Sequence, residues 1–263
     1  MKLTLTALRK RLPPAWLMAA LLPPLLTPGC GAQAQAEVQA DPPPAIYVAG
    51  TRDPDWKSYR AFVEGMKVFE QQHQLAPAAP LRFMLRPRTT KATLAGVEMT
   101  IEGDGIRIPV PVAADGSFVL PRNDAVAEQG AEIMLTKRRN TLSWRPSVHS
   151  PGVPQDARRL GDLRLECAVR WAVEQADLLA LFRSAINAFG GACSSAAVKV
   201  EYISDRPLRA VWLVAGERRE MLPAKWIEEE GHVYLPPVHD TSWPDSTLLE
   251  FEYLPAAQAA AGL

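Results

Sequence analysis

The sequence predicts an α+β protein dominated by β-structure. We expect two small antiparallel β-sandwich-like units, with a helical hairpin between them and an N-terminal amphipathic helix before them. Three patterns support this. Apolar residues recur at helical spacing before residue 75, short alternating segments between Gly- and Pro-rich turns begin at residue 81, and helical spacing returns over 173–189. Short strands separated by turns about every 8–12 residues are typical of a sandwich.

The first 36 residues have the features of a secretory signal peptide. Four cations and no acidic residue precede an apolar run over 15–26, and small residues follow over 31–36. The run is shorter than the roughly 20 residues that span a bilayer, and Pro23-Pro24 would break a buried helix. Ala34 and Ala36 both fit the cleavage rule, and we adopt Ala36. A periplasmic or secreted protein is therefore expected.

The cysteines allow two interpretations of the export route. Cleavage after Ala36 removes Cys30 and leaves Cys167 and Cys193, which are expected to form a disulfide in an oxidising compartment. Alternatively, Cys30 is the lipidated first residue of an outer-membrane lipoprotein. Gly29 fits that alternative, whereas Thr27 and Pro28 depart from the usual lipobox.

Charge and motifs exclude several classes of function. The chain balances 29 Lys and Arg against 29 Asp and Glu, so loss of the four leader cations leaves a mildly acidic protein, unsuited to nucleic acid. No later segment is apolar enough to cross a membrane. Phosphate-loop, dinucleotide and α/β-hydrolase motifs are missing, and the histidines have no zinc-site spacing. We expect no metal and no cofactor; an envelope protein or a glycan is the expected partner.

Residues 37–80 are predicted to contain an extended spacer, a short strand at 46–48 and one helix. Asp53 is the expected N-cap and Pro54 the first helical residue. An apolar stripe at three- and four-residue steps carries the helix to about His73.

The first β unit is expected over 81–166. Its strands are predicted at 97–101, 106–110, 118–120, 133–135 and 142–144, with the last two paired through a polar turn at 137–140. A long loop is expected over 146–161, because it is rich in Pro and Gly.

The helical hairpin is assigned to residues 167–195. Strict alternation over 163–171 predicts a strand, and helical spacing over 173–189 predicts a helix that Gly190-Gly191 ends. A helix folding back along that strand would make the Cys167–Cys193 bond feasible.

The second β unit is expected over 196–255, followed by a frayed tail over 256–263. Its strands are predicted at 198–202, 211–213, 233–235 and 249–253. Gly116–Pro121 and Gly231–Pro236 share a Gly-x-apolar-apolar-Leu-Pro pattern, which suggests that the two β units are related.

Two segments resemble a known domain. Ala95-Gly96-Val97-Glu98-Met99-Thr100-Ile101 and Ala114-Asp115-Gly116-Ser117-Phe118-Val119-Leu120 are similar to the glycine-preceded strand and the a-D-G-x-F turn of the carboxypeptidase regulatory-like (transthyretin-like) β-sandwich. The resemblance covers residues 81–145. It implies a non-catalytic module that assists folding or mediates binding, and the zinc-binding residues of true carboxypeptidases have no match.

The candidate site residues fall into two groups. His239, Ser242 and Asp245 could form the nucleophilic cluster of a small secreted hydrolase, although local turn hydrogen bonds explain the same residues more simply. Six basic residues could bind an anionic glycan or a lipid head group, although such residues more often form a solvated face or protect a sheet edge: Arg86, Arg88, Lys91, Lys137, Arg138 and Arg139. Trp243 is a further binding candidate. The leading expectation is an exported non-catalytic binding, scaffold or envelope-assembly protein. The loops 146–161 and 238–246 are its expected contact surfaces.

Overall fold

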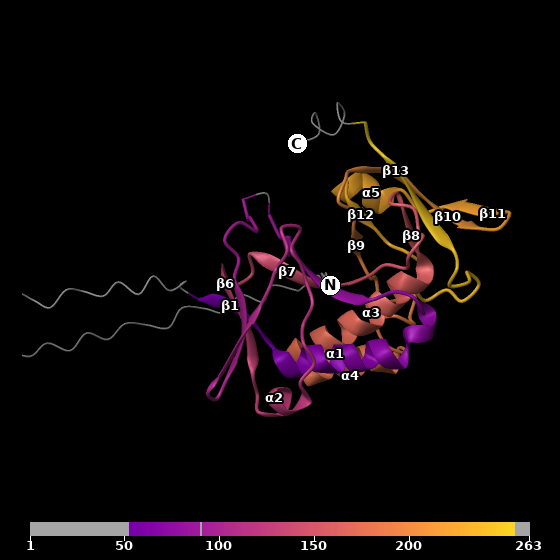
Figure 1. The fold of residues 1–263 in the computed structure, drawn as a ribbon. Coiled ribbons are helices and arrows are strands. Elements are labelled where there is room, and N and C mark those ends of the chain that lie inside the picture. The colour runs from indigo at the N-terminus through magenta and orange to yellow at the C-terminus, as the bar shows by residue number, and fades with distance from the viewer. Residues whose placement is uncertain (1–52, 90, 256–263) are drawn as a thin grey trace, which may run out of the picture. The chain divides into compact units, whose positions relative to one another are not determined.

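The computed structural model describes residues 53–89 and 91–255. The predicted signal peptide, Cys30, the strand at 46–48 and the tail at 256–263 lie outside these residues. The described part has four antiparallel sheets and five α-helices, so the predicted α+β, β-dominated class is confirmed (Figure 1).

Two sheets, which we call the N-terminal sheets, form the first part of the fold. One has the strand order β1-β6-β3-β4 and the other β5-β2-β7. Their strands are β1 (Pro54–Ser58), β2 (Leu81–Pro87), β3 (Met99–Gly103), β4 (Ile106–Val110), β5 (Ser117–Phe118), β6 (Glu132–Arg138) and β7 (Leu142–Val148). Side chains of both sheets enter one hydrophobic core, which agrees with a sandwich-like unit.

The pairing of β6 and β7 differs from the prediction. These strands follow one another in the chain, but β6 pairs with β1 and β3 whereas β7 pairs with β2. The intervening residues therefore connect the two sheets instead of closing a hairpin. A polar turn between alternating segments does not reveal this, because the same turn chemistry serves both connections.

Helix α1 (Tyr59–Gln71) is the predicted amphipathic helix, but it begins later than expected. The residues from Pro54 to Ser58 form β1, and the side chain of Ser58 is the N-cap, accepting a hydrogen bond from the Ala61 amide at 3.4 Å. Pairing of β1 with β6 satisfies the backbone here, so tertiary structure overrides the capping signals of Asp53 and Pro54. The 3₁₀ turn η1 (His73–Leu75) follows the helix.

The predicted strand over 163–171 is wrong, because these residues belong to helix α3 (Leu160–Glu174). The alternating apolar residues do not lie on one face of a sheet. Instead, the helix is buried on most of its circumference, so polar positions such as Asp162, Glu166 and Arg170 are buried as well. A helix surrounded by protein has no single apolar stripe, and its periodicity is therefore ambiguous.

Helix α3 contributes to both hydrophobic cores. Leu165, Val169 and Val173 pack with α1 and the N-terminal sheets. Leu160, Leu163 and Cys167 pack with the strands that follow in the chain. Figure 1 shows α3 beside α1. In the chain, α3 precedes every strand of the C-terminal part except β8.

The helix predicted over 173–189 is interrupted. Helix α3 continues to Glu174, the 3₁₀ turn η2 (Gln175–Asp177) follows, and α4 (Ala180–Ala188) begins after an extended pair at 178–179. The predicted end is confirmed: Gly190 and Gly191 follow α4 with φ of 87° and 93°, a backbone region that favours glycine.

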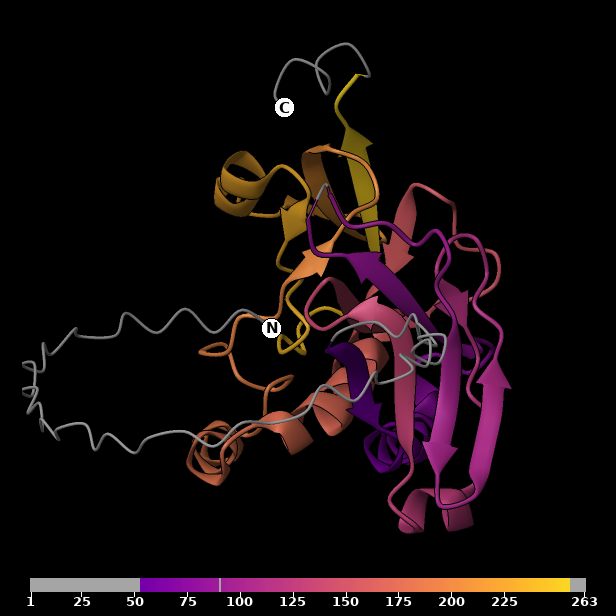
Figure 2. The same ribbon diagram turned by 90° about the vertical axis from the view of Figure 1, so that its left-hand side faces the viewer.

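The C-terminal sheets comprise a four-stranded sheet of order β11-β10-β13-β8 and the pair β12-β9. Their strands are β8 (Ala157–Arg159), β9 (Tyr202–Ile203), β10 (Leu208–Ala215), β11 (Arg218–Met221), β12 (Val233–Tyr234) and β13 (Leu248–Tyr253). In Figure 2 the strands β9 to β13 are the orange and yellow ones, and β2, β3 and β4 of the N-terminal sheets are purple to magenta. The short helices α2 (Asp124–Glu128) and α5 (Lys225–Glu230) complete the fold.

The predicted loop over 146–161 and the predicted strand over 198–202 are both shorter in the structure. Strand β7 reaches Val148 and β8 occupies Ala157–Arg159, so the irregular part of the loop is 149–156. Only Tyr202 and Ile203 form a strand in the second segment.

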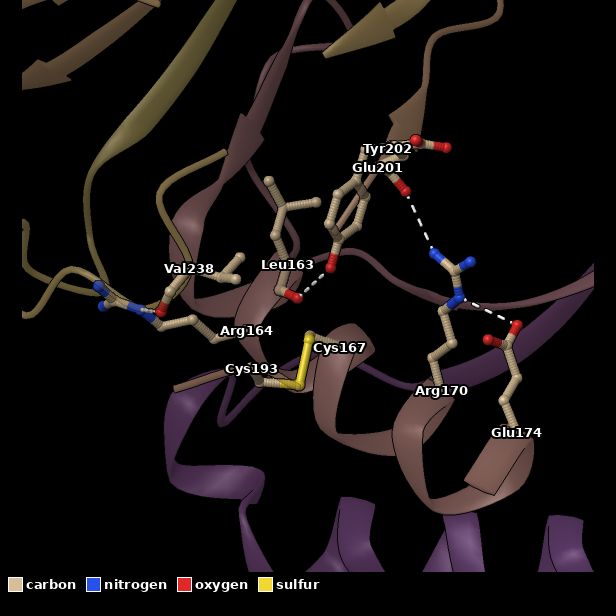
Figure 3. Close-up of a disulfide and its surroundings, with 9 residues drawn as sticks. All are labelled: Leu163, Arg164, Cys167, Arg170, Glu174, Cys193, Glu201, Tyr202 and Val238. Atoms are coloured by element: carbon tan, nitrogen blue, oxygen red, sulfur yellow. Dashed lines mark hydrogen bonds and ion pairs between the residues drawn. A yellow bond between two sulfur atoms is a disulfide. The ribbon is translucent and has the colours of Figure 1, made fainter. Parts of the chain in front are cut away.

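The predicted disulfide joins Cys167 and Cys193, whose Cα atoms are 5.9 Å apart (Figure 3). The route between them differs from the expected one, because Cys167 lies on α3 and not on a strand. The bond therefore ties the segment after α4 to the central helix.

Candidate ligand-binding cleft

A cleft of about 300 Å³ lies between the N-terminal and C-terminal sheets. Strands β2 and β7 line it from the first group, and β8, β9, β12 and β13 from the second. Helix α3 and the loop 149–155 complete the wall. Part of the loop predicted as a contact surface therefore borders this cleft. Its volume is at the lower end of the range of about 300–1,000 Å³ found for small-molecule sites.

Four arginines line the cleft: Arg86, Arg145, Arg158 and Arg170. Arg158 on β8 pairs with Glu166 on α3, with 2.7 Å between Nη2 and Oε1. The same Oε1 accepts the backbone amide of Val148 at 2.7 Å, and Arg158 donates to the Val148 carbonyl at 3.1 Å. Burial raises the pKa of Glu166, and the Arg158 guanidinium opposes that rise. The pair fastens the end of β7 to α3.

Arg170 and Arg145 share a carboxylate. Arg170 Nε lies 3.0 Å from Oε1 of Glu174, and Arg145 Nη1 lies 2.8 Å from the same oxygen. Arg170 also donates through Nη1 to the backbone carbonyl of Glu201 at 3.1 Å (Figure 3). Burial, and then the charge of Arg170, lower the pKa of Arg145 to about 10. Two guanidinium groups therefore share one carboxylate at this end of the cleft.

Two guanidinium nitrogens of the cleft arginines are buried without a hydrogen-bond partner. Among the residues that the structure describes, only Arg158 Nε, Arg170 Nη2 and Thr247 Oγ1 are in this condition. Leaving a buried donor unsatisfied costs about 1–3 kcal/mol, and more for a charged group. A buried polar group without a hydrogen-bond partner is rare in a native protein, and a position in a binding site is one explanation for it.

An aromatic row forms another wall of the cleft. Ring centroids are 5.9 Å apart for Tyr202 and Tyr234, 5.2 Å for Tyr234 and Phe251, and 6.0 Å for Phe251 and Tyr253. Burial raises the pKa of the Tyr202 hydroxyl, which donates to the carbonyl of Leu163 at 2.5 Å. The row offers an apolar surface that is positioned by hydrogen bonding to α3.

Asp162, in the first turn of α3, holds the loop at the mouth of the cleft. Its carboxylate accepts the Ser150 amide at 2.7 Å and the Ser150 hydroxyl at 2.6 Å. His149 precedes this anchor and lines the cleft while remaining exposed at its rim. Loss of solvation, followed by the charge of Arg158, lowers the pKa of His149 to about 4, so this ring is neutral at neutral pH.

The basic residues predicted from sequence are dispersed. Arg86 lines the cleft and pairs with Asp205. The other five lie outside its lining: Arg88, Lys91, Lys137, Arg138 and Arg139. Arg88 donates to the Leu142 carbonyl at 2.9 Å, Lys137 donates to the Ala95 carbonyl at 2.5 Å, and Arg139 stacks on Trp56.

Trp243 is buried in the second core, with 2% of its surface exposed. The Arg218 guanidinium covers its ring at 3.5 Å from the centroid. This places Trp243 in the core and away from the cleft.

His239, Ser242 and Asp245 lie on one loop but have different partners. The Ser242 amide donates to Asp240 Oδ1 at 2.9 Å, which is the turn hydrogen bond expected from the sequence. Asp245 forms an ion pair with Arg164 of α3, and His239 is exposed. Within residues 53–89 and 91–255, no hydrogen bond links these three side chains to one another.

Sequence reasoning missed Arg145, Arg158 and Arg170. The signal that could have found Arg170 is the four-residue spacing of Asp162, Glu166, Arg170 and Glu174, which places them along one side of a helix. Because four is also a multiple of two, the same spacing fits a strand. No local signal marks Arg145 or Arg158, since distant strands bring them to the cleft.

In the described part of the chain, no helix is long and apolar enough to cross a membrane, and His, Cys, Asp and Glu form no group of three that could hold a metal ion. No family model matches the sequence, and comparisons with curated proteins and with solved structures found no match. The resemblance of residues 81–145 to a carboxypeptidase regulatory-like domain stays a prediction.

Proposed function

We propose that the chain is an exported, non-catalytic binding protein, periplasmic or secreted, whose ligand occupies the cleft between the N-terminal and C-terminal sheets. The observation that carries this proposal is the cleft of about 300 Å³ with buried, unpartnered donors on Arg158 and Arg170. Binding sites combine an apolar wall with a few placed polar groups, as the aromatic row and the arginines do. Export is supported by the order of charge, apolar run and small residues in the first 36 positions.

The binding part is tested by native mass spectrometry of protein purified without denaturation from its own cells. We expect a small-molecule adduct that dissociates on denaturation. Ser147→Trp, which fills the cleft from β7, should abolish the adduct. Ser246→Trp adds the same side chain at an exposed position outside the cleft and should retain it. Equal adducts in both variants would place the ligand elsewhere.

The export part is tested by the intact mass of the same preparation, before and after reduction and alkylation. A chain that begins at Glu37 or Gln35 supports release by signal peptidase. A lipid on Cys30 would instead support anchoring as a lipoprotein. Retention of Met1 would overturn the export proposal.

A further inference from the structure

Arg164 and Arg170 lie on the same helix (Figure 3). The hydrogen-bonding capacity of their guanidinium groups is satisfied to different extents. Arg164 uses all three of its nitrogens: Nε donates to the Val238 carbonyl at 3.0 Å, Nη1 pairs with Asp245, and Nη2 donates to the carbonyls of Asp240 and Trp243 at 2.6 and 3.0 Å. Arg170, with only 7% of its surface exposed, leaves Nη2 without a partner. The fold can therefore satisfy a buried guanidinium fully, but does not do so at the cleft.

The two donors without a hydrogen-bond partner, Arg158 Nε and Arg170 Nη2, are the features of the cleft that point to a ligand. The guanidinium groups of Arg145, Arg158 and Arg170 share the carboxylates of Glu166 and Glu174. Arg86 pairs with Asp205, and Glu201 also lines the cleft. The remaining protein contact of Arg170 is a backbone carbonyl, which carries no full charge. A guanidinium cannot accept a hydrogen bond, so its ligand must present acceptor atoms. Charge-assisted hydrogen bonds to an anion are about twice as strong as those between neutral groups.

We propose that the cleft binds a small organic anion whose carboxylate or phosphate oxygens accept hydrogen bonds from the guanidinium groups of Arg158 and Arg170 and whose apolar part packs on the row Tyr202, Tyr234, Phe251 and Tyr253. This inference rests on the proposed binding function and specifies its ligand class. The cleft volume of about 300 Å³ fits a small molecule better than a polymer. Because the arginines and the aromatic row lie on separate walls of the cleft, we expect a ligand that has a negatively charged group and an apolar group.

The test uses the full mature protein and four probes: phenyl phosphate, benzoate, inorganic phosphate and phenol. Binding is followed by the ¹H–¹⁵N resonance of Arg158 Nε, which is assigned by its loss in Arg158→Lys. We expect phenyl phosphate or benzoate to shift this resonance, and the tighter of the two identifies the preferred oxyanion. Phenol lacks the charge and should bind at least tenfold more weakly. Inorganic phosphate should compete with the aromatic anion.

Two matched variants locate the donor on α3. Arg170→Lys keeps the charge but loses the planar donor set, and should weaken binding of the aromatic anion by roughly tenfold or more. Arg164→Lys makes the same change on the same helix outside the cleft, and should alter affinity by less than about twofold. Far-UV circular dichroism checks the fold of both. Since Arg170→Lys could fail to fold, the wild-type resonance and the competition by phosphate decide the question independently.

The outcomes separate this inference from the proposed function. If phenol binds as tightly as phenyl phosphate and perturbs the same cleft residues, the ligand class is wrong while the binding function stands. If no probe perturbs the cleft although a native adduct is lost in Ser147→Trp, the anion inference alone fails. If that adduct is missing too, both proposals fail.

Discussion

Gly65 of α1 and Val173 of α3 are in such close contact that no side chain fits between them. A Cβ atom on Gly65 would lie 2.8 Å from Cγ2 of Val173 and 3.4 Å from Cγ1 of Val169. Valine has one strongly preferred rotamer in a helix and cannot easily move aside. The glycine therefore sets the distance at which the two helices pack.

Gly65→Ala should lower the free energy of unfolding by up to about 2 kcal/mol. Alanine is favoured over glycine in a helix interior by about 1 kcal/mol, but overpacking costs about 1–3 kcal/mol. Urea denaturation measures the change. In a Val173→Ala background the clash disappears, so the same substitution should become stabilising. Stabilisation by Gly65→Ala alone would contradict the close packing.

Removing the Glu166 carboxylate should destabilise the protein strongly. Glu166→Ala removes the carboxylate that neutralises Arg158 and accepts the Val148 amide, at an expected cost of about 3–5 kcal/mol. Glu252→Ala is the control, because Glu252 pairs with Arg209 on the surface and such pairs contribute about 0–1 kcal/mol. Equal effects of the two substitutions in urea unfolding would refute a structural role for the buried pair.

Reduction of the Cys167–Cys193 bond should lower stability by about 3 kcal/mol, since it closes a separation of 26 residues. Thermal unfolding with and without a reductant measures the loss. Cys167→Ser/Cys193→Ser should show the lower melting temperature without reductant and no further change on adding it. A reductant effect that persists in this variant would have another origin.

His149 should titrate with a midpoint near 4, below its ordinary value of 6.5. The unfolded chain then binds a proton at higher pH than the folded chain, so the contribution of His149 to stability is complete above about 6.5 and is lost as the pH falls toward 4. NMR of the imidazole resonances measures the midpoint. His149→Gln should reduce the loss of stability between these pH values. A midpoint near 6.5 would mean that the loop leaves the ring solvated, and a higher midpoint would place it beside an acid.

Sequence patterns predicted the elements that have one exposed and one buried face. The apolar stripe of α1 and the alternation in β3 and β4 are of this kind, because water on one side imposes a readable period. Helix α3 has protein on most sides, so Asp162, Glu166 and Arg170 interrupt its apolar pattern at positions that are equally buried. Pairing partners were harder still, since β6 and β7 separate into different sheets although they are neighbours in sequence.

The site was less predictable than the fold. Of the basic residues expected to bind a ligand, Arg86 alone lines the cleft. Arg158 and Arg170 acquire their significance from burial and from a missing partner, and neither property has a local sequence signal. The disulfide was predictable because the expected cleavage of a leader that holds Cys30 leaves two cysteines and therefore one pairing, whatever the path between them.

The sharing of α3 between two cores has a consequence for how the protein unfolds. If either group of sheets separated from α3, the apolar side chains on that side of the helix would become exposed to water. This exposure would destabilise α3 and, with it, the other group of sheets that packs on the helix. Neither group can therefore melt without weakening its neighbour. The described part of the chain is expected to behave as a single cooperative unit, with one heat-absorption peak whose calorimetric and van't Hoff enthalpies agree.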